Sequence, residues 1–179
     1  MLVLRKFCRE DFPFLKRWIT SQRFCIQWSG PHFSYPLDDD QLEHYLSVVE
    51  DDRIPDIGFM AVSEDSTMPV GHIKIGNVDA AAGTGTLQFV IIGDEGNRNK
   101  GMGRELVSKA VAYGFDTLGL QSINLKVFDF NAAALACYRK IGFEEIRRIE
   151  ASYIIDGAAE TWNGLEMDLT RRRWALRRS

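Results

Sequence analysis

One stretch decides the fold, residues 91–104: Ile91-Ile92-Gly93-Asp94-Glu95-Gly96-Asn97-Arg98-Asn99-Lys100-Gly101-Met102-Gly103-Arg104. An apolar segment that is typical of a buried strand ends here, and a polar loop containing glycine connects it to a segment with helical periodicity. The start of a helix presents unpaired backbone N–H groups and the positive end of the helix dipole. Glycines let a phosphate approach these groups, and Arg98, Lys100 and Arg104 supply charged donors. The stretch therefore predicts a strand, a diphosphate-binding loop and a helix.

Other nucleotide-binding motifs do not fit this stretch. A Walker loop requires Gly-Lys-Ser/Thr, which does not follow, and the Gly-x-Gly-x-x-Gly motif fails because Leu106 occupies the position of the third glycine. A Gly-x-Gly pattern is weak by itself, and a second copy stands at residues 83–85. A tight strand-to-helix connection with solvated basic residues remains an alternative interpretation.

Hydrophobic periodicity extends this unit in both directions. A helical stripe follows Lys100 and ends near Gly119, and Asn131 can cap a further helix that closes at Gly142. The pattern predicts the α/β class, as an α+β mixed sheet with flanking helices. The expected strands are Leu2–Leu4, Gly58–Ser63, Val70–Val78, Leu87–Ile92, Ser122–Phe130, Phe143–Ile155 and Thr161–Leu169; earlier helices are expected to be capped by Asp11 and by Asp38–Asp40, with a loop over Gln22–Leu37.

Length and charge indicate one globular domain. We place it at residues 1–170, followed by a basic tail at residues 171–179. The apolar share of 45% and the charged share of 26% argue against disorder. Removing the five positive charges of the tail from the formal net charge of −3 leaves −8 on the domain. An acidic body with a basic terminus argues against a nucleic-acid-binding protein, and we expect the tail to be solvated.

Apolar runs and cysteines limit the environment of the protein. The longest clean apolar run, Phe89–Ile92, is too short for a membrane helix, and Arg5 and Lys6 interrupt any signal-peptide core. Three cysteines without C-x-x-C spacing indicate neither a disulfide framework nor a zinc site. We expect a cytoplasmic monomer or homodimer that has no metal and does not bind nucleic acid or a membrane.

Two motifs resemble the GNAT superfamily of acetyl-CoA-dependent N-acetyltransferases. The family signature Arg/Gln-x-x-Gly-x-Gly/Ala is matched by residues 98–103, Arg-Asn-Lys-Gly-Met-Gly. Members also carry an Asn, a Tyr seven residues later and a closing Gly-Phe, as do Asn131, Tyr138 and residues 142–143 here. The loop Trp28–Leu37 looks most like the branch of ribosomal-protein N-terminal and some aminoglycoside acetyltransferases. The resemblance covers roughly residues 2–169.

The resemblance implies where acetyl-CoA would bind. In that fold the strand holding Ile91 and Ile92 parts from the strand holding Val127, and pantetheine pairs with the exposed edges as an added strand would. The Asn131 side chain would contact the pantetheine arm, although helix capping alone also explains an Asn there. The cofactor-binding residues implied in this way are Ile91, Ile92, Arg98, Asn99, Lys100, Gly101, Met102, Gly103, Arg104 and Asn131.

Tyr138 is the catalytic residue that the resemblance implies. Members use a Tyr at this position to protonate the departing CoA thiolate, and a phenol with a pKa of about 10 keeps its proton at neutral pH. A purely structural role for Tyr138 in the core remains an alternative. A backbone N–H near Ile92 would stabilise the oxyanion of the tetrahedral intermediate.

Lys126 departs from the family pattern. Many members have an acidic residue five positions before the Asn, able to take the proton of the acceptor ammonium, and a lysine cannot replace it. Either Lys126 points elsewhere, or Asp129, Glu160 or His72 relays the proton, or the acceptor carries a negative group that Lys126 binds. The candidate substrate residues are Trp28, His32 and Lys126, although the aromatic loop can also simply pack onto the first helices.

These observations predict an acetyl-CoA-dependent N-acetyltransferase. It would transfer acetyl by direct attack in a ternary complex to a primary amine, which belongs to a protein N-terminus or to a small molecule. Acetyl-CoA is the expected cosubstrate and no metal is expected. Two other functions stay open: an acyl-CoA-binding sensor without turnover, motivated by Lys126, and a nucleotide- or phosphate-binding regulator that uses only the glycine loop.

Overall fold

The computed structural model describes residues 1–65, 67–94, 96 and 100–177, and a mixed sheet organises them. The strands lie in the order β1-β2-β3-β4-β5-β7-β6. Neighbouring strands are antiparallel except for the parallel pair β4 and β5, which confirms the mixed α/β sheet. The strands are β1 (Leu2–Lys6), β2 (Ile57–Ser63), β3 (Pro69–Asp79), β4 (Thr84–Ile92), β5 (Ser122–Phe128), β6 (Glu144–Ile155) and β7 (Ala158–Thr170).

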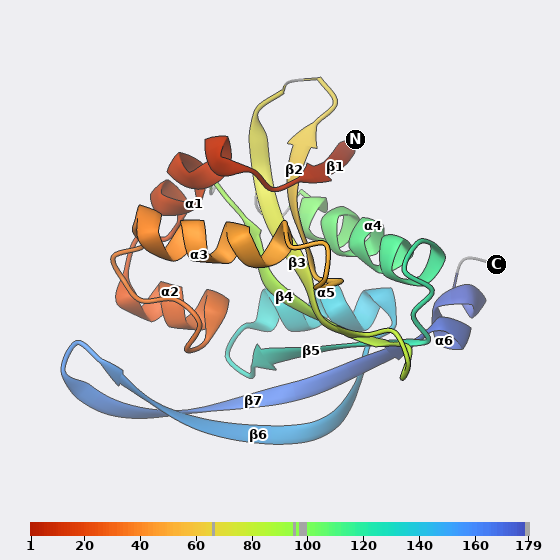
Figure 1. Ribbon diagram of the computed structural model, residues 1–179. Helices are drawn as coiled ribbons and strands as arrows, with labels where there is room; N and C mark the ends of the chain where they lie inside the picture. The colour runs from red at the N-terminus through yellow and green to blue at the C-terminus, as the bar shows by residue number, and fades with distance from the viewer. Residues whose placement is uncertain (66, 95, 97–99, 178–179) are drawn as a thin grey trace.

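Helices cover both faces of this sheet (Figure 1). One face carries α1, α2 and α3, preceded by the short 3-10 helix η1, and the other carries α4 and α5; α6 follows β7 at the C-terminal end. None of the helices in the described ranges is both long and apolar enough to cross a membrane. The bounds are η1 (Arg9–Asp11), α1 (Phe12–Trp18), α2 (Gln22–Ser29), α3 (Asp39–Val49), α4 (Met102–Asp116), α5 (Ala132–Ile141) and α6 (Arg171–Leu176).

Alternating side chains on the central strands explain why both faces are covered. Ile73 and Ile75 of β3 and Leu87 of β4 belong to the core under α4 and α5. Met60 of β2 and Ile91 of β4 belong to a second core under α1, α2 and α3. Each fully buried aliphatic side chain contributes about 1.5–3 kcal/mol. The two cores therefore fasten both helix layers to the same strands.

Three of the predicted helix ends are confirmed. The Asp38 carboxylate accepts a hydrogen bond from the backbone N–H of Gln41 at 2.9 Å and caps α3. The Asn131 side chain accepts one from the N–H of Ala134 at 3.2 Å and caps α5. Gly142 ends α5 at φ 118°, a conformation that glycine adopts without a steric penalty.

The expectation that the Asp11 side chain caps α1 is wrong. Asp11 stands at the N-cap position, but its side chain makes no capping hydrogen bond. The carboxylate is fully buried and instead accepts two hydrogen bonds from the Arg5 guanidinium, at 2.6 and 2.7 Å, and one from the N–H of Cys8. A buried carboxylate is costly unless it is paired, and this requirement overrides the local capping preference.

The loop predicted over Gln22–Leu37 is wrong in its first half. Ser21 accepts a hydrogen bond from the N–H of Phe24 at 3.1 Å and so starts α2. Cys25 and Trp28 are buried on one side of this helix. Residues that favour turns begin only at Gly30, where φ is 60° and the helix ends.

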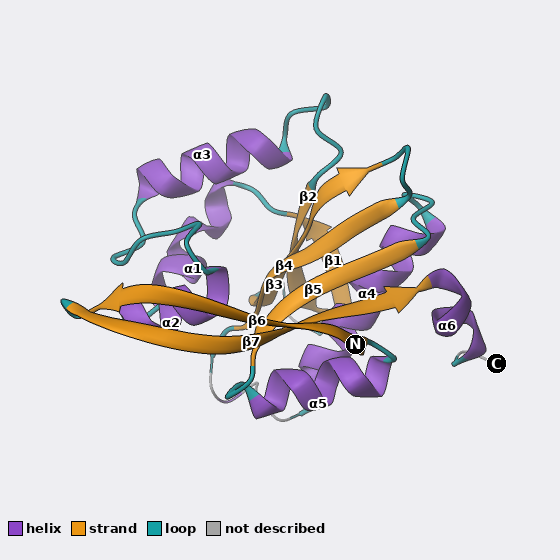
Figure 2. Ribbon diagram, turned by 90° about the horizontal axis from the view of Figure 1, so that it is seen from below, coloured by secondary structure: helices purple, strands orange, loops and turns teal. Residues whose placement is uncertain are grey.

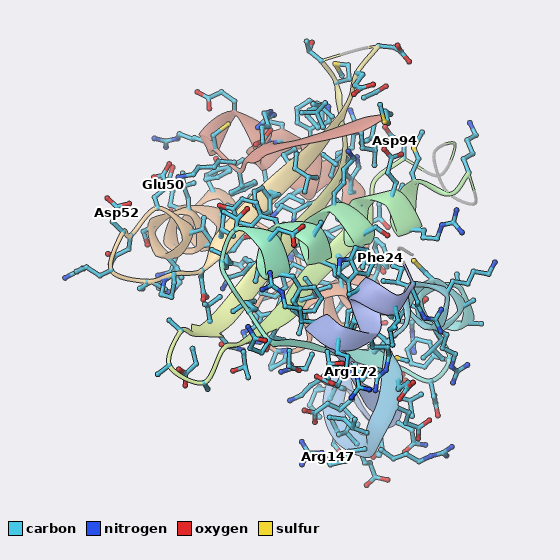
Figure 3. The ribbon with its side chains drawn as sticks, turned by 90° about the vertical axis from the view of Figure 1, so that its right-hand side faces the viewer. Phe24, Glu50, Asp52, Asp94, Arg147 and Arg172 are labelled. Atoms are coloured by element: carbon cyan, nitrogen blue, oxygen red, sulfur yellow. The ribbon has the colours of Figure 1, made fainter. Side chains whose placement is uncertain are left out.

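The C-terminal arginines are not a solvated tail over the described residues. The Arg171 guanidinium donates to the Phe115 carbonyl, and Arg173 forms an ion pair with Glu144 at 2.8 Å. Trp174 packs against the core under α4. Figure 3, which views the molecule from this end, shows α6 between α4 and the β6–β7 hairpin, with the labelled Arg172 on it. The segment is folded onto the domain because a backbone carbonyl and an acidic side chain there bind its guanidinium groups.

Gly93→Ala is expected to destabilise the fold. A Cβ at Gly93 would lie 2.0–2.5 Å from three atoms of the Trp18 indole, which is almost fully buried. Overpacking of this kind costs about 1–3 kcal/mol. The free energy of unfolding in urea measures the loss. Gly103→Ala is the control, because a Cβ there would meet its nearest described neighbour at 3.8 Å, and equal stability of the two variants would contradict the packing argument.

Candidate active site

The parallel strands β4 and β5 separate near the middle of the sheet. Their pairing ends at Leu87 and Leu125, and beyond these residues no pair joins the described parts of the two strands. Each strand stays paired on its outer side, β4 with β3 as far as Ile92 and β5 with β7 as far as Phe128. The facing edges therefore part, as the resemblance implied. An extended chain with amide groups can pair with such edges as an added strand.

A bulge in β4 lies where the strands part. His72 and Lys74 of β3 pair with Ile91 and Gln88, so three residue steps of β4 oppose two of β3. The extra residue leaves Phe89 at φ 53°, which is rare for a residue other than glycine. Because a bulge bends its strand, this feature directs the end of β4 away from β5.

The N-terminus of α4 abuts the end of β4. Gly101 is the N-cap at φ 81°, and a Cβ on Gly103 would lie 3.8 Å from Ile92, its nearest described neighbour. The first turn thus has open space on this side. Lys100 and Arg104 are exposed there, and Met102 packs partly against the core. Two further predicted cofactor residues lie outside the described ranges, Arg98 and Asn99.

The acidic residue in the first turn of α4 is turned away from this opening. The Glu105 carboxylate accepts a hydrogen bond from the backbone N–H of Leu2 at 2.7 Å, which fastens it to β1. Its negative charge is therefore engaged elsewhere, and the helix start presents backbone N–H groups and positive side chains. This combination suits a diphosphate.

Asn131 and Tyr138 both belong to α5. The Oδ1 atom of Asn131 caps the helix, whereas its Nδ2 makes no hydrogen bond within the described ranges, so capping leaves a donor available. Tyr138 is 7% exposed in the core under α5, with the Phe143 ring at 5.9 Å. Its hydroxyl makes no hydrogen bond to a described residue. Burial raises the pKa of Tyr138 well above its ordinary value, so the phenol is protonated at neutral pH.

On the opposite face, Trp28 and His32 surround the bulge. The Trp28 ring is 8% exposed and lies 5.5 Å from the Phe89 ring, so it belongs to the buried core there. The His32 ring also lies 5.5 Å from Phe89, but His32 is exposed to solvent and makes no side-chain hydrogen bond within the described ranges. The structure thus brings His32, rather than Trp28, to an accessible place beside the gap.

Lys126 faces the same side as His32. It is exposed on β5 between Leu125 and Val127, which are buried in the core under α4 and α5, so its side chain projects from the other face. Partial burial, together with the positive charges of Lys74 and Lys126, lowers the pKa of His32 below its ordinary value of 6.5. His32 is therefore neutral at pH 7.

Two of the predicted proton relays, His72 and Glu160, are already engaged in hydrogen bonds. His72 is fully buried, its Nδ1 donates to the Phe89 carbonyl and its Nε2 accepts from the Tyr45 hydroxyl, both at 3.0 Å. Burial lowers the pKa of His72 to about 4. The Glu160 carboxylate is paired with Arg23 and also accepts from the Trp162 indole. His72 thus supports the bulge. Asp129, the third predicted relay, stays a candidate base.

The end of the β6–β7 hairpin lies against α2, on the face of the sheet that carries α1, α2 and α3. The hairpin is long and curved, and its end reaches α2 (Figure 2). The Gln22 side chain donates to the Ile154 carbonyl at 3.1 Å and accepts from the Asp156 N–H at 2.8 Å. The hairpin turn is therefore fastened to the start of α2.

Sequence reasoning missed two features of this site. The left-handed Phe89 has no local signal, because neither its type nor its neighbours favour that conformation. The second feature is the buried ion pair of Lys74 with Asp56 at 2.9 Å, in which both side chains are 9% exposed. The sequence around Lys74 does not indicate this partner, because Asp56 lies outside the strand that holds Lys74.

Solved structures with the same arrangement are acetyltransferases. Spermidine N-acetyltransferase from Vibrio cholerae in complex with CoA and spermine superposes with a TM-score of 0.80 at 23% identity, covering 97% of this chain and 98% of that chain. A dodecameric structure of that enzyme in an intermediate state gives 0.76 at 23% identity, covering 99% and 98%. At these identities the likeness concerns the fold.

The parted parallel strands beside the N-terminus of α4 match the arrangement that the resemblance to acetyl-CoA-dependent acetyltransferases implied. A family model for the acetyltransferase (GNAT) domain matches residues 1–144. The chain belongs to the GNAT acetyltransferase family and is an N-acetyltransferase that uses acetyl-CoA. Within the described ranges, no cluster of three or more His, Cys, Asp or Glu side chains is arranged to hold a metal ion.

Gly103→Val is expected to weaken CoA binding at least about tenfold while leaving the fold intact. A Cβ at Gly103 meets no described atom closer than Ile92 at 3.8 Å, but a branched side chain would occupy the approach of a diphosphate to the main chain. Calorimetric titration with CoA measures the affinity, and the melting temperature reports the fold. Unchanged affinity would remove the first turn of α4 from the cofactor site.

Proposed function

We propose that this enzyme transfers acetyl directly from acetyl-CoA to a primary amine while both substrates are bound. The observation that carries the proposal is the parting of β4 from β5 beside the N-terminus of α4. The gap offers unpaired strand edges for the pantetheine amides, and the helix start offers N–H groups for the diphosphate. The assigned cofactor residues are those predicted above, with Asn131 Nδ2 directed to the pantetheine arm.

Two side chains on opposite faces supply the proton transfers in this proposal. His32 accepts a proton from the acceptor ammonium, and the neutral amine then attacks the thioester carbonyl. A backbone N–H of β4 beyond the bulge stabilises the oxyanion. As the C–S bond breaks, the Tyr138 hydroxyl protonates the departing sulfur. The nitrogen of the intermediate releases its extra proton to water, and water returns a proton to the Tyr138 phenolate. His32 is suited because it is neutral, accessible and unbonded, whereas His72 is enclosed.

The non-catalytic alternatives are separated by two measurements. A sensor without turnover binds CoA but releases no thiol with any amine, and a phosphate-binding regulator binds ADP as tightly as CoA. We expect CoA to bind more tightly than ADP, because only CoA has a pantetheine arm to fill the gap. Calorimetry with both ligands and a thiol-release assay over a panel of amines distinguish the three functions.

The acceptor amine and the assembly belong to this proposal as well. The enzymes from Vibrio cholerae are named for spermidine and spermine, and one of their structures is described as dodecameric. For this chain we keep the prediction of a cytoplasmic monomer or homodimer acting on a small-molecule or peptide amine. Light scattering during gel filtration measures its mass in solution.

Tyr138→Phe is expected to lower kcat about 100-fold, because it removes the proton donor to the thiolate. CoA affinity should change little, since the ring and its packing remain. Tyr113→Phe is the matched control: Tyr113 lies on α4, packs against Phe59 in the same core and is given no catalytic role. A kcat of Tyr138→Phe equal to that of the control would exclude Tyr138 from the mechanism.

His32→Asn is expected to lower kcat about 100-fold and to change its pH profile. In the wild type, kcat at saturating substrates should fall as the pH drops through a pKa below 6.5, because protonated His32 cannot accept a proton. The variant should lose this step. His44→Asn on α3, also exposed, is the control. An acidic step that survives in His32→Asn would assign the base to another group, with Asp129 the next candidate.

A further inference from the structure

Lys126 is a cation without a counter-ion beside the gap. It is the first residue of β5 beyond the stretch paired with β4, and it projects from the face that carries α1, α2 and α3. Its ammonium group forms no ion pair or hydrogen bond with a residue of the described ranges. His32 lies on the same face, where its ring is 5.5 Å from that of Phe89 in the β4 bulge.

The acidic residue that stands opposite Lys126 on β7 is already engaged. Glu166 of β7 is its cross-strand partner, but the Arg147 guanidinium of β6 donates to that carboxylate, with its Nε at 3.1 Å. Lys74, which lies on the same face, is paired with Asp56 at 2.9 Å. Arg147 and Lys74 thus each have an acidic partner, whereas Lys126 has none among the described residues.

We infer that the acceptor of this enzyme is an amine whose molecule also carries an anionic group, a carboxylate or a phosphate, and that Lys126 binds that group. The inference rests on the proposed transfer of acetyl to an amine at the gap between β4 and β5. An acceptor anion supplies the counter-charge that the described residues do not. A charge-assisted hydrogen bond to the exposed ammonium fixes the acceptor at the end opposite its amine.

The same charge disfavours a polyamine. A second ammonium group brought near Lys126 is repelled, with an energy that grows as water is excluded from the site. Lys126 therefore disfavours a polyamine as the acceptor of this enzyme, although the fold is shared with enzymes named for spermidine.

Pairing with the acceptor anion leaves the proton transfer to a separate group. His32, which is neutral at pH 7 and lies on the same face of the sheet, is the group that receives the amine proton in the proposed function. A lysine in place of the usual carboxylate is then consistent with turnover, provided that the acceptor brings its own anion.

Matched acceptors test the inference with the intact enzyme and acetyl-CoA. The set is 4-aminobutyrate, 3-aminopropylphosphonate, butylamine and spermidine, with thiol release as the rate assay and mass spectrometry of the product. We expect kcat/KM for an anionic amine to exceed that for butylamine about tenfold or more, and the ratio to fall with added salt. The phosphonate separates phosphate from carboxylate recognition, and peptides beginning Ala-Glu or Ala-Gln extend the comparison to protein N-termini.

Two substitutions test the role of the lysine itself. Lys126→Met should lower the ratio of kcat/KM for the anionic amine over butylamine about tenfold, and Lys126→Glu should make spermidine the better acceptor. Lys6→Met is the matched control, because Lys6 is an exposed strand lysine on the distant edge strand β1, and its ratio should equal that of the wild type. CoA affinity of each variant shows that it is folded.

The outcomes separate this inference from the proposed function. If the wild type prefers butylamine or spermidine to every anionic amine, or if Lys126→Met keeps the wild-type ratio, Lys126 does not bind the acceptor and the inference is wrong, while acetyl transfer stands. If CoA binds but no amine is acetylated, the proposed function itself fails.

Discussion

The bulge in β4 is the feature on which the site depends, because it bends the strand where the pairing of β4 with β5 ends, at Leu87 and Leu125. Beyond that point β4 stays paired with β3 and β5 stays paired with β7. The bulge at Phe89 sets the point of divergence, and the buried His72 holds the Phe89 carbonyl at 3.0 Å. The gap is therefore built into the sheet and does not depend on a ligand to open it.

The two faces of the sheet contribute different groups to the surroundings of this gap. On one face, α4 brings its N-terminus to the end of β4, and α5 carries Asn131 and Tyr138. On the other face, the first helices place His32 beside the bulge, and β5 presents Lys126. In the proposed mechanism, a thioester held between the strands is reached from one side by the acceptor and from the other by the proton donor.

Prediction from the sequence succeeded where a requirement is local. Asn131 caps a helix, Gly142 ends it in a left-handed conformation, and Gly101 opens α4, since each role depends on a few neighbouring backbone groups. Prediction failed where the role of a residue depends on a partner that the fold brings to it. Asp11 is used to neutralise Arg5 rather than to cap α1, and the arginines of α6 find acceptors on Phe115 and Glu144, far away in the chain.

The sequence by itself determined the family, the strands, and the helices α4 and α5 on either side of β5, because these depend on short motifs and on hydrophobic periodicity. Only the tertiary structure decided that His72 is enclosed while His32 is accessible, and that Lys126 has no counter-ion among the described residues. The physical reason is that solvent access and charge balance depend on which residues the sheet brings together from distant segments. Glu166 stands opposite Lys126, yet β6 supplies Arg147 to that same carboxylate, and no local pattern around Lys126 contains this information.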